Sequence, residues 1–114
     1  MKTLTISDID WELIATQDDC EVRGNALVSG DEDEDKRVED EIIERLNNGD
    51  EWAWASVEVR GTFNGLVASD YLGCCSYANA DDFKTGGYFD DMQENVLEQL
   101  QAAAESIVNA MVEV

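Results

Sequence analysis

The dipeptide Asn64-Gly65, placed between two runs rich in β-branched and aromatic residues, constrains the fold more than any other feature of this sequence. The flanking runs are residues 52–63 (WAWASVEVRGTF) and 66–72 (LVASDYL). Asn and Gly both tolerate positive φ, which a two-residue loop between antiparallel strands requires. The sequence therefore predicts a β-hairpin centred on Asn64-Gly65.

A further strand is expected near the N-terminus. Apolar residues alternate with polar ones over residues 3–15, but the alternation changes phase at Ser7-Asp8. Because successive side chains of a strand point to opposite faces, a phase change indicates a bulge or a bend. Residues 20–29 (CEVRGNALVS) leave two alternatives, which are a further strand of the sheet or a loop that leads to the first helix.

The first predicted helix follows an acidic run at residues 31–35. Acidic side chains favour the first turn of a helix, where backbone N–H groups are unpaired. The apolar residues Val38, Ile42 and Leu46 then recur at helical spacing, and Asn47-Asn48-Gly49 is typical of a helix end. This pattern predicts an amphipathic helix between residues 31 and 49.

The second predicted helix runs from Tyr88 to about Glu113 and is preceded by a loop at residues 73–87. Apolar residues recur along it every three or four positions, which predicts a buried stripe. The members of that stripe are Phe89, Met92, Val96, Leu100, Ala103, Ile107 and Met111.

Together these elements predict an α+β fold in one domain that spans residues 1–114. The expected order is β-(β)-α-β-β-α. It gives a small antiparallel sheet of three or four strands with two helices on one face.

The charge of the chain is extreme and unevenly distributed. With 27 acidic residues, 7 basic residues and no histidine, the net charge is −20. Such a charge argues against a basic groove for nucleic acid and against adsorption to an anionic membrane, and the absence of histidine excludes His-based chemistry. Residues 31–51 carry −8 and residues 74–114 carry −7, whereas residues 52–73 carry only −1. The two helices are therefore expected to hold most of the charge.

Helical spacing places carboxylates on the outer side of both helices, opposite the apolar stripes. An anionic face of this kind either is merely solvated or binds a basic protein surface, in the extreme as a mimic of DNA. The excess of 27 acids over 7 bases favours binding. The candidate partner-binding residues are Asp33, Glu34, Asp40, Glu41, Glu44, Asp91, Glu94, Glu98 and Glu105.

Metal-binding and catalytic patterns are weak. Asp31, Asp33 and Asp35 match the first three ligand positions of an EF-hand, but Lys36 and Ile42 occupy positions that need Gly and Glu. The carboxylate pairs Asp81-Asp82, Asp90-Asp91 and Glu39-Asp40-Glu41 have only Lys84 and Arg60 as candidate supporting bases, with no motif around either. We therefore expect no enzymatic activity, no bound metal and no cofactor.

The aromatic residues are expected to pack in the core. An exposed aromatic interface anchor remains an alternative, for which Trp52 and Tyr77 are the candidates.

The three cysteines, Cys20, Cys74 and Cys75, do not form the even, spaced set of a disulfide framework or a zinc site. We expect them to be thiols. Because neither a signal-peptide pattern nor an apolar stretch long enough to cross a membrane is present, a cytoplasmic location is expected.

Several segments together resemble a known family. They are residues 23–30 (RGNALVSG), 39–46 (EDEIIERL), 49–54 (GDEWAW), 70–77 (DYLGCCSY) and 86–92 (GGYFDDM). They are similar to small acidic proteins of unassigned function that bacteriophages and other mobile elements of proteobacteria encode. The resemblance spans Arg23 to Met92 and implies no catalytic residues. It implies a context in which small acidic proteins often inhibit host defence, as anti-CRISPR and anti-restriction proteins do, in several cases by mimicking DNA.

The leading hypothesis is therefore a non-catalytic inhibitor that occludes the nucleic-acid-binding site of a basic host protein, such as a CRISPR effector or a restriction enzyme. It would act in the host cytoplasm, as a monomer or homodimer, without binding nucleic acid or membrane. One alternative is a homo-oligomeric assembly module whose near-neutral hairpin, Trp52 to Leu72, makes the contacts and whose acidity only confers solubility. Another alternative is a protein that binds divalent metal ions.

Overall fold

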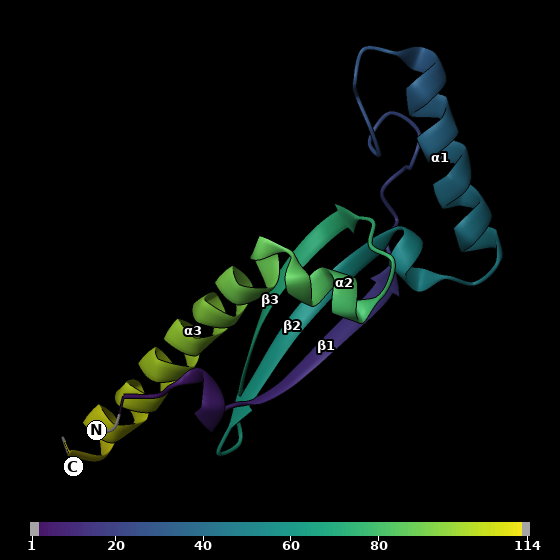
Figure 1. Ribbon diagram of the computed structural model, residues 1–114. Helices are drawn as coiled ribbons and strands as arrows, with labels where there is room; N and C mark the ends of the chain where they lie inside the picture. The colour runs from purple at the N-terminus through teal and green to yellow at the C-terminus, as the bar shows by residue number, and fades with distance from the viewer. Residues whose placement is uncertain (1–2, 113–114) are drawn as a thin grey trace. The chain divides into compact units, whose positions relative to one another are not determined.

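The computed structural model describes the backbone of residues 3–112 and the side chains of residues 3–110. A three-stranded antiparallel sheet has the strand order β1-β2-β3. The helices and strands follow the order shown in Figure 1, which is η1 (Ile6–Asp8), β1 (Asp10–Gln17), α1 (Glu32–Asn47), η2 (Glu51–Ala53), β2 (Ala55–Phe63), β3 (Leu66–Cys75), α2 (Ala80–Thr85) and α3 (Gly87–Val112).

These elements confirm the α+β class and the order β-α-β-β-α with two main helices. The sheet has three strands. Residues 20–29 form bends, turns and irregular backbone, so this segment is the loop that leads to the first helix and not a further strand. The placement of both helices on one face of the sheet stays a prediction.

The chain divides into two compact units, and every strand contributes to both. Unit 1 comprises Met1–Ile14, Glu58–Tyr71 and Gly86–Val114. Unit 2 comprises Ala15–Val57 and Leu72–Thr85. A single domain over residues 1–114 stays a prediction.

The hairpin turn has the predicted geometry. Asn64 has φ of 48° and Gly65 has φ of 83°, so both central residues lie in the left-handed region. β2 begins at Ala55, three residues later than predicted, because Glu51–Ala53 forms a 3₁₀ turn. The Asp50 carboxylate stabilises that turn by accepting a hydrogen bond from the Trp52 N–H at 3.1 Å.

In unit 1, α3 lies along the strand segments of the same unit (Figure 1). Leu4, Ile9, Val96 and Leu100 form the buried cluster. Helix and sheet approach closely at Gly61, where an added Cβ would lie 2.8 Å from both Ile9 Cγ2 and Val96 Cγ1. Glycine is therefore needed at this point of β2.

The predicted stripe of α3 is buried only along part of the helix. Met92, Val96 and Leu100 are buried, as predicted, but the next buried position is Ala104, where Ala103 was expected. Ile107 is 48% exposed, so its assignment to the core is wrong. The Met111 side chain lies outside the described residues.

The phase change near the N-terminus is a short helix. Ile6–Asp8 forms the 3₁₀ turn η1, and the regular strand starts only at Asp10. The predicted strand over residues 3–15 is therefore wrong in its first part, because a helical turn occupies Ser7-Asp8 and the regular strand covers Asp10–Gln17.

In unit 2, α1 and the loop before it enclose a second cluster, formed by Val22, Ile42, Ala53 and Trp54. Asp31 caps the start of α1, because its carboxylate accepts from the N–H groups of the second and third helical residues at 3.1 and 3.3 Å. The helix thus starts and ends where its sequence predicts.

The expectation of a continuous loop over residues 73–87 is wrong. β3 extends to Cys75, and Ala80–Thr85 forms the short helix α2. Phe83 of α2 is fully buried, with ring centroids 5.9 Å from Trp52 and 4.9 Å from Tyr77. Contact with Phe83 covers part of both rings, so Trp52 and Tyr77 are half-buried and neither is a fully exposed interface anchor.

Candidate functional site

The acidic face of α3 is the most uniformly charged surface that the sequence analysis predicted. We define it by Asp91, Glu94, Glu98 and Glu105, all of which are exposed. At 3.6 residues per turn, these four positions fall within about 60° of the helix circumference and extend over roughly 21 Å of its axis. The structure therefore brings the four predicted residues of this helix together in one row.

No cation neutralises this row within its own helix. Gly87–Val112 contains no Lys or Arg. Among the described residues, no Lys or Arg forms an ion pair with a member of the row. The carboxylates are thus available to a cationic partner.

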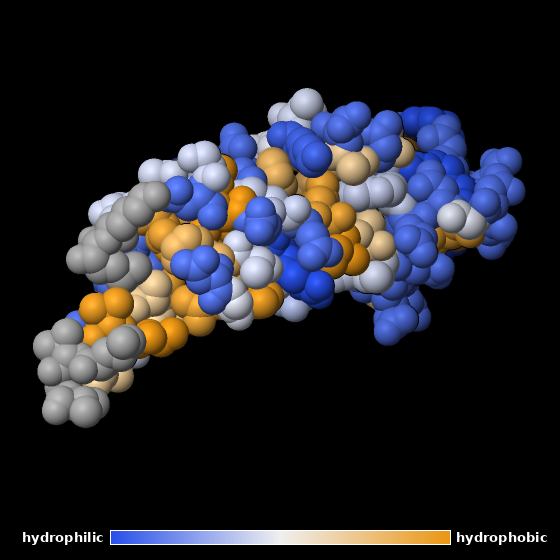
Figure 2. Space-filling view, turned by 90° about the horizontal axis from the view of Figure 1, so that it is seen from below, coloured by the Kyte–Doolittle hydropathy of each residue, from blue (hydrophilic) through white to orange (hydrophobic). Residues whose placement is uncertain are grey.

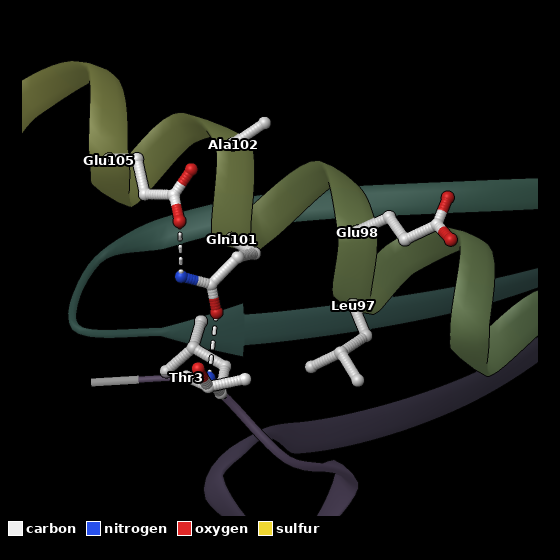
Figure 3. A pocket seen from close by; sticks show the side chains of 7 residues that line it. Thr3, Leu97, Glu98, Gln101, Ala102 and Glu105 are labelled. Carbon is white, nitrogen blue, oxygen red and sulfur yellow. Dashed lines mark hydrogen bonds between the residues drawn. The ribbon is translucent and has the colours of Figure 1, made fainter. Parts of the chain in front are cut away.

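A shallow hollow of about 300 Å³ borders the C-terminal half of the acidic face. It is lined by Thr3, Leu4, Leu97, Glu98, Gln101, Ala102 and Glu105. Figure 3 shows Glu98 and Glu105 on the helix with Gln101 between them. An apolar surface beside carboxylates is suited to the aliphatic stem and cationic head of a Lys or Arg side chain.

Gln101 fixes one wall of that hollow. Its Oε1 accepts a hydrogen bond from the Leu4 N–H at 2.7 Å, and its Nε2 donates to Glu105 Oε1 at 3.0 Å (Figure 3). The side chain joins the N-terminal segment to α3 and orients Glu105 at the same time. Helical spacing alone places Gln101 on the outer side of α3, so its structural role was not predictable from the sequence.

The acidic face predicted for α1 is largely paired within unit 2. Arg37 donates to Glu34 and, at 2.8 Å, to Glu41. Lys36 Nζ lies 2.7 Å from Asp40 Oδ2. Figure 2 shows an extensively hydrophilic surface over this helix, but much of its negative charge has a nearby cation.

Arg23, which lies in the loop before α1, adds a non-local pair. Its Nη2 is 2.6 Å from Asp40 Oδ1. Hydrogen bonds from Lys36 and then Arg23 lower the pKa of Asp40, and a hydrogen bond from Arg37 lowers the pKa of Glu34. The remaining predicted residues of this helix, Asp33 and Glu44, are exposed.

Glu39 does not join Asp40 and Glu41 in the surface cluster of carboxylates that the sequence suggested. Its side chain turns inward and is only 7% exposed, while Asp40 and Glu41 point outward. Its Oε2 accepts from the Gly24 N–H at 2.6 Å, and its Oε1 accepts from Arg23 Nη1 at 3.3 Å. The helical spacing of Glu39 from Ile42 was the available signal, because positions three apart share a face.

Three other acidic side chains accept hydrogen bonds from nearby backbone N–H groups. Asp31 caps α1, and Asp35 accepts hydrogen bonds from the N–H and Oγ of Ser29. Asp82 accepts from the Ala78 N–H at 2.9 Å, just before α2. Among the described residues, no group of three or more His, Cys, Asp or Glu is arranged to hold a metal ion.

Arg60 belongs to a polar group on the sheet of unit 1. It donates to Glu58 at 2.8 and 3.2 Å, and the Ser69 hydroxyl donates to the same carboxylate at 2.6 Å. Hydrogen bonds from Ser69 and then Arg60 lower the pKa of Glu58. Arg60 is therefore engaged with Glu58.

The expectation that all three cysteines are thiols is wrong, because Cys20 and Cys74 form a disulfide with Cα atoms 6.0 Å apart. The Asp18 carboxylate links both half-cystines, because it accepts a hydrogen bond from the Cys20 N–H at 2.9 Å and another from the Cys74 N–H at 2.7 Å. The hydrogen bond from Cys74 and then that from Cys20 lower the pKa of Asp18. Cys75 is a free thiol, and burial raises its pKa.

Comparison with known proteins gives no relative from which residues could be transferred, since no family model, curated protein or solved structure matches the chain. Within the described residues, none of the helices has the length and hydrophobicity needed to cross a membrane.

Proposed function

We propose that this protein is a non-catalytic inhibitor of the phage type, which occludes the nucleic-acid-binding site of a basic host-defence protein. The target class is a CRISPR effector or a restriction enzyme. The observation that carries the proposal is the row of four exposed carboxylates on α3, in a helix without a single basic residue. Such a row attracts a positively charged surface and gives it several closely spaced contacts.

The charge density of the row supports mimicry of a nucleic acid. One strand of duplex DNA presents a phosphate about every 3.4 Å, hence about six over the roughly 21 Å that the row covers. The four carboxylates therefore supply about two thirds of the charge of one strand. A protein surface built to bind phosphates would meet a comparable, though sparser, field.

The ion pairs of α1 make α3 the principal binding element in this proposal. Pairing of Glu34, Asp40 and Glu41 reduces the field that α1 projects into solvent. Asp33 and Glu44 remain as secondary contacts. The proposal also retains the prediction that the two helices cover one face of the sheet.

A pair of charge-reversal variants tests the role of α3. Glu94→Lys with Glu98→Lys changes the net charge by the same amount as Asp33→Lys with Glu44→Lys on α1. Capture of basic proteins from host lysate, and inhibition of the captured target, should be lost in the α3 variant and largely kept in the α1 variant. Equal losses would mean that only total charge matters, and an unaffected α3 variant would place the binding site elsewhere.

Competition and salt titration test the mechanism. Duplex DNA should displace the protein from its captured target, because both would occupy the same basic surface. Binding should weaken steeply between about 0.05 and 0.3 M NaCl, since ions screen exposed charges over about 10 Å at 0.1 M. Binding that is indifferent to salt and to DNA would refute the mimicry.

The proposed location is the host cytoplasm. Cytoplasmic thiol systems keep most cysteines reduced, so the Cys20–Cys74 disulfide would be found mainly in chains exposed to an oxidising environment. Because the acidic face lies in unit 1 and the disulfide lies in unit 2, the proposal requires inhibition by both the oxidised and the reduced chain.

A further inference from the structure

The chain between β1 and α1 in unit 2 buries little of its own surface. Residues 20–30, which we call the connecting segment, form neither helix nor strand, and Figure 1 shows them as an irregular loop. Within this range only Val22 is buried, whereas Val28 is 80% exposed. Segments with few buried apolar contacts open at a low cost in free energy. The connecting segment therefore depends on specific anchors to stay closed.

Hydrogen bonds and one covalent bond provide these anchors. The Trp54 indole N–H donates to the Cys20 carbonyl at 2.7 Å, and the Gly24 N–H donates to Glu39 Oε2 at 2.6 Å. The disulfide joins Cys20 to Cys74 near the end of β3. Hydrogen bonds are exchanged for bonds to water when a segment opens, whereas a covalent bond must be cleaved. The disulfide is thus the anchor that keeps the start of the segment in place.

One half of this disulfide is accessible to a reductant. Cys74 is exposed, whereas Cys20 is half-buried. Cys74 also has φ of 52°, in the left-handed region that residues other than glycine seldom occupy. Exposed or strained disulfides are the labile ones that serve in regulation. The position of Cys74 therefore favours reduction of the bond in the folded chain.

We propose that the Cys20–Cys74 disulfide is a redox switch that controls opening of the connecting segment. A dithiol reductant supplies the electron pair. Its first thiolate attacks Cys74 Sγ and forms a mixed disulfide, while the bond to Cys20 breaks and Cys20 leaves as a thiolate that takes up a proton. The second thiolate of the reductant then attacks the reductant sulfur of the mixed disulfide, and Cys74 is released and protonated. The reductant is oxidised to its disulfide, and the chain is reduced to the dithiol.

Reduction acts on the population of the opened form and leaves the closed form in place. The closed segment keeps its hydrogen bonds with Trp54 and Glu39. Without the covalent anchor, Val22 leaves its contact with Trp54 more often. Opening makes the peptide bond after Arg23 accessible to proteases, so the lifetime of the chain depends on the redox state around it. The inference is independent of the proposed function, because it concerns unit 2 and not the acidic face.

Limited trypsin digestion of the intact chain tests the switch, and the sequence supplies a matched site. The tetrapeptide EVRG occurs at residues 21–24 in the connecting segment and again at residues 58–61 in β2. Unequal cleavage after Arg23 and Arg60 therefore reports structure and not local sequence. After reduction with dithiothreitol and removal of the reductant, cleavage after Arg23 should be about tenfold or more faster than in the oxidised chain. In the reduced chain it should also be about tenfold or more faster than cleavage after Arg60.

Two variants separate the disulfide from the third cysteine. Cys20→Ser should be cleaved after Arg23 like the reduced chain without any reductant, whereas Cys75→Ser keeps the bond and should respond to reductant like the wild type. Circular dichroism before digestion measures whether each sample keeps its helices.

Four outcomes would overturn the inference. Equal rates after Arg23 in the oxidised and reduced chains would mean that the bond does not control opening. Equal rates after Arg23 and Arg60 in the reduced chain would mean that only global unfolding exposes them. A bond that resists dithiothreitol in the absence of denaturant, or a reduced wild-type chain without helical signal, would equally exclude a switch within the folded protein.

Discussion

Loss of the Cys20–Cys74 disulfide should markedly destabilise unit 2. The bond joins residues 54 positions apart, and a cross-link over a loop of that length lowers the entropy of the unfolded chain by an amount worth about 4 kcal/mol at 25 °C. The folded geometry has other supports, because Asp18 accepts hydrogen bonds from both half-cystines and the Trp54 indole N–H donates to the Cys20 carbonyl at 2.7 Å. Breaking the bond should therefore act mainly on the unfolded state.

Urea unfolding followed by tryptophan fluorescence measures this difference. The oxidised wild type and the Cys20→Ser variant should differ by about 4 kcal/mol in the free energy of unfolding, as an upper value. Cys75→Ser is the matched control, because Cys75 lies outside the disulfide and its removal leaves the cross-link intact. Treatment with a thiol reductant should bring the control close to Cys20→Ser.

Thiol counting in denaturant provides the independent check. The oxidised chain should release one reactive thiol, that of Cys75, and the reduced chain should release three. Three thiols in protein purified under oxidising conditions, or equal stabilities of Cys20→Ser and Cys75→Ser without reductant, would refute the reasoning.

Three further predictions concern packing, a buried carboxylate and pH. Gly61→Ala should cost about 1–3 kcal/mol in chemical denaturation, because its Cβ would lie 2.8 Å from two methyl carbons, whereas Gly87→Ala, with nothing within 4 Å, should be neutral or slightly stabilising. Glu39→Ala should cost about 1–3 kcal/mol by removing the buried carboxylate that accepts hydrogen bonds from the Gly24 N–H and from Arg23, whereas Asp40→Ala removes only exposed ion pairs and should cost less than about 1 kcal/mol. Asp18 should titrate below its ordinary pKa of 3.8 in a carboxyl NMR titration, so its stabilising effect is present above that pH and disappears as the pH falls through the lowered value. Equal costs within either pair of variants, or an Asp18 pKa at or above 3.8, would contradict the corresponding prediction.

Much of the secondary structure was predictable because its determinants are local. Asn64-Gly65 favours a two-residue turn whatever the rest of the chain does, and both residues have positive φ in the structure. Asp31 caps α1 through N–H groups two and three residues away. The short turn at Glu51–Ala53 was missed because Trp52 and Trp54 have strong β propensity, whereas the adjacent Asp50 caps a 3₁₀ turn.

The candidate site was predictable in part, for the same reason. The helical period is enough to align Asp91, Glu94 and Glu98, so the acidic face of α3 follows from the sequence. On α1 the helical period also predicts where the carboxylates lie, but it does not predict that Arg23, which lies outside the helix, pairs with one of them. Arg23 lies 17 positions before Asp40 in the sequence, and only folding of the intervening loop brings the two together.

The sequence alone therefore determined the hairpin, the extents of the two long helices and the acidic row on α3, because spacing and capping act over a few residues. Tertiary structure decided which carboxylates remain available, which cysteines pair and where the apolar stripe loses its cover. Glu39 is buried and Cys20 is bonded to Cys74 because chain segments return from distant positions, whereas Ile107 is exposed although it continues the apolar stripe of α3. Such returns depend on the packing of each unit as a whole, which no local pattern specifies.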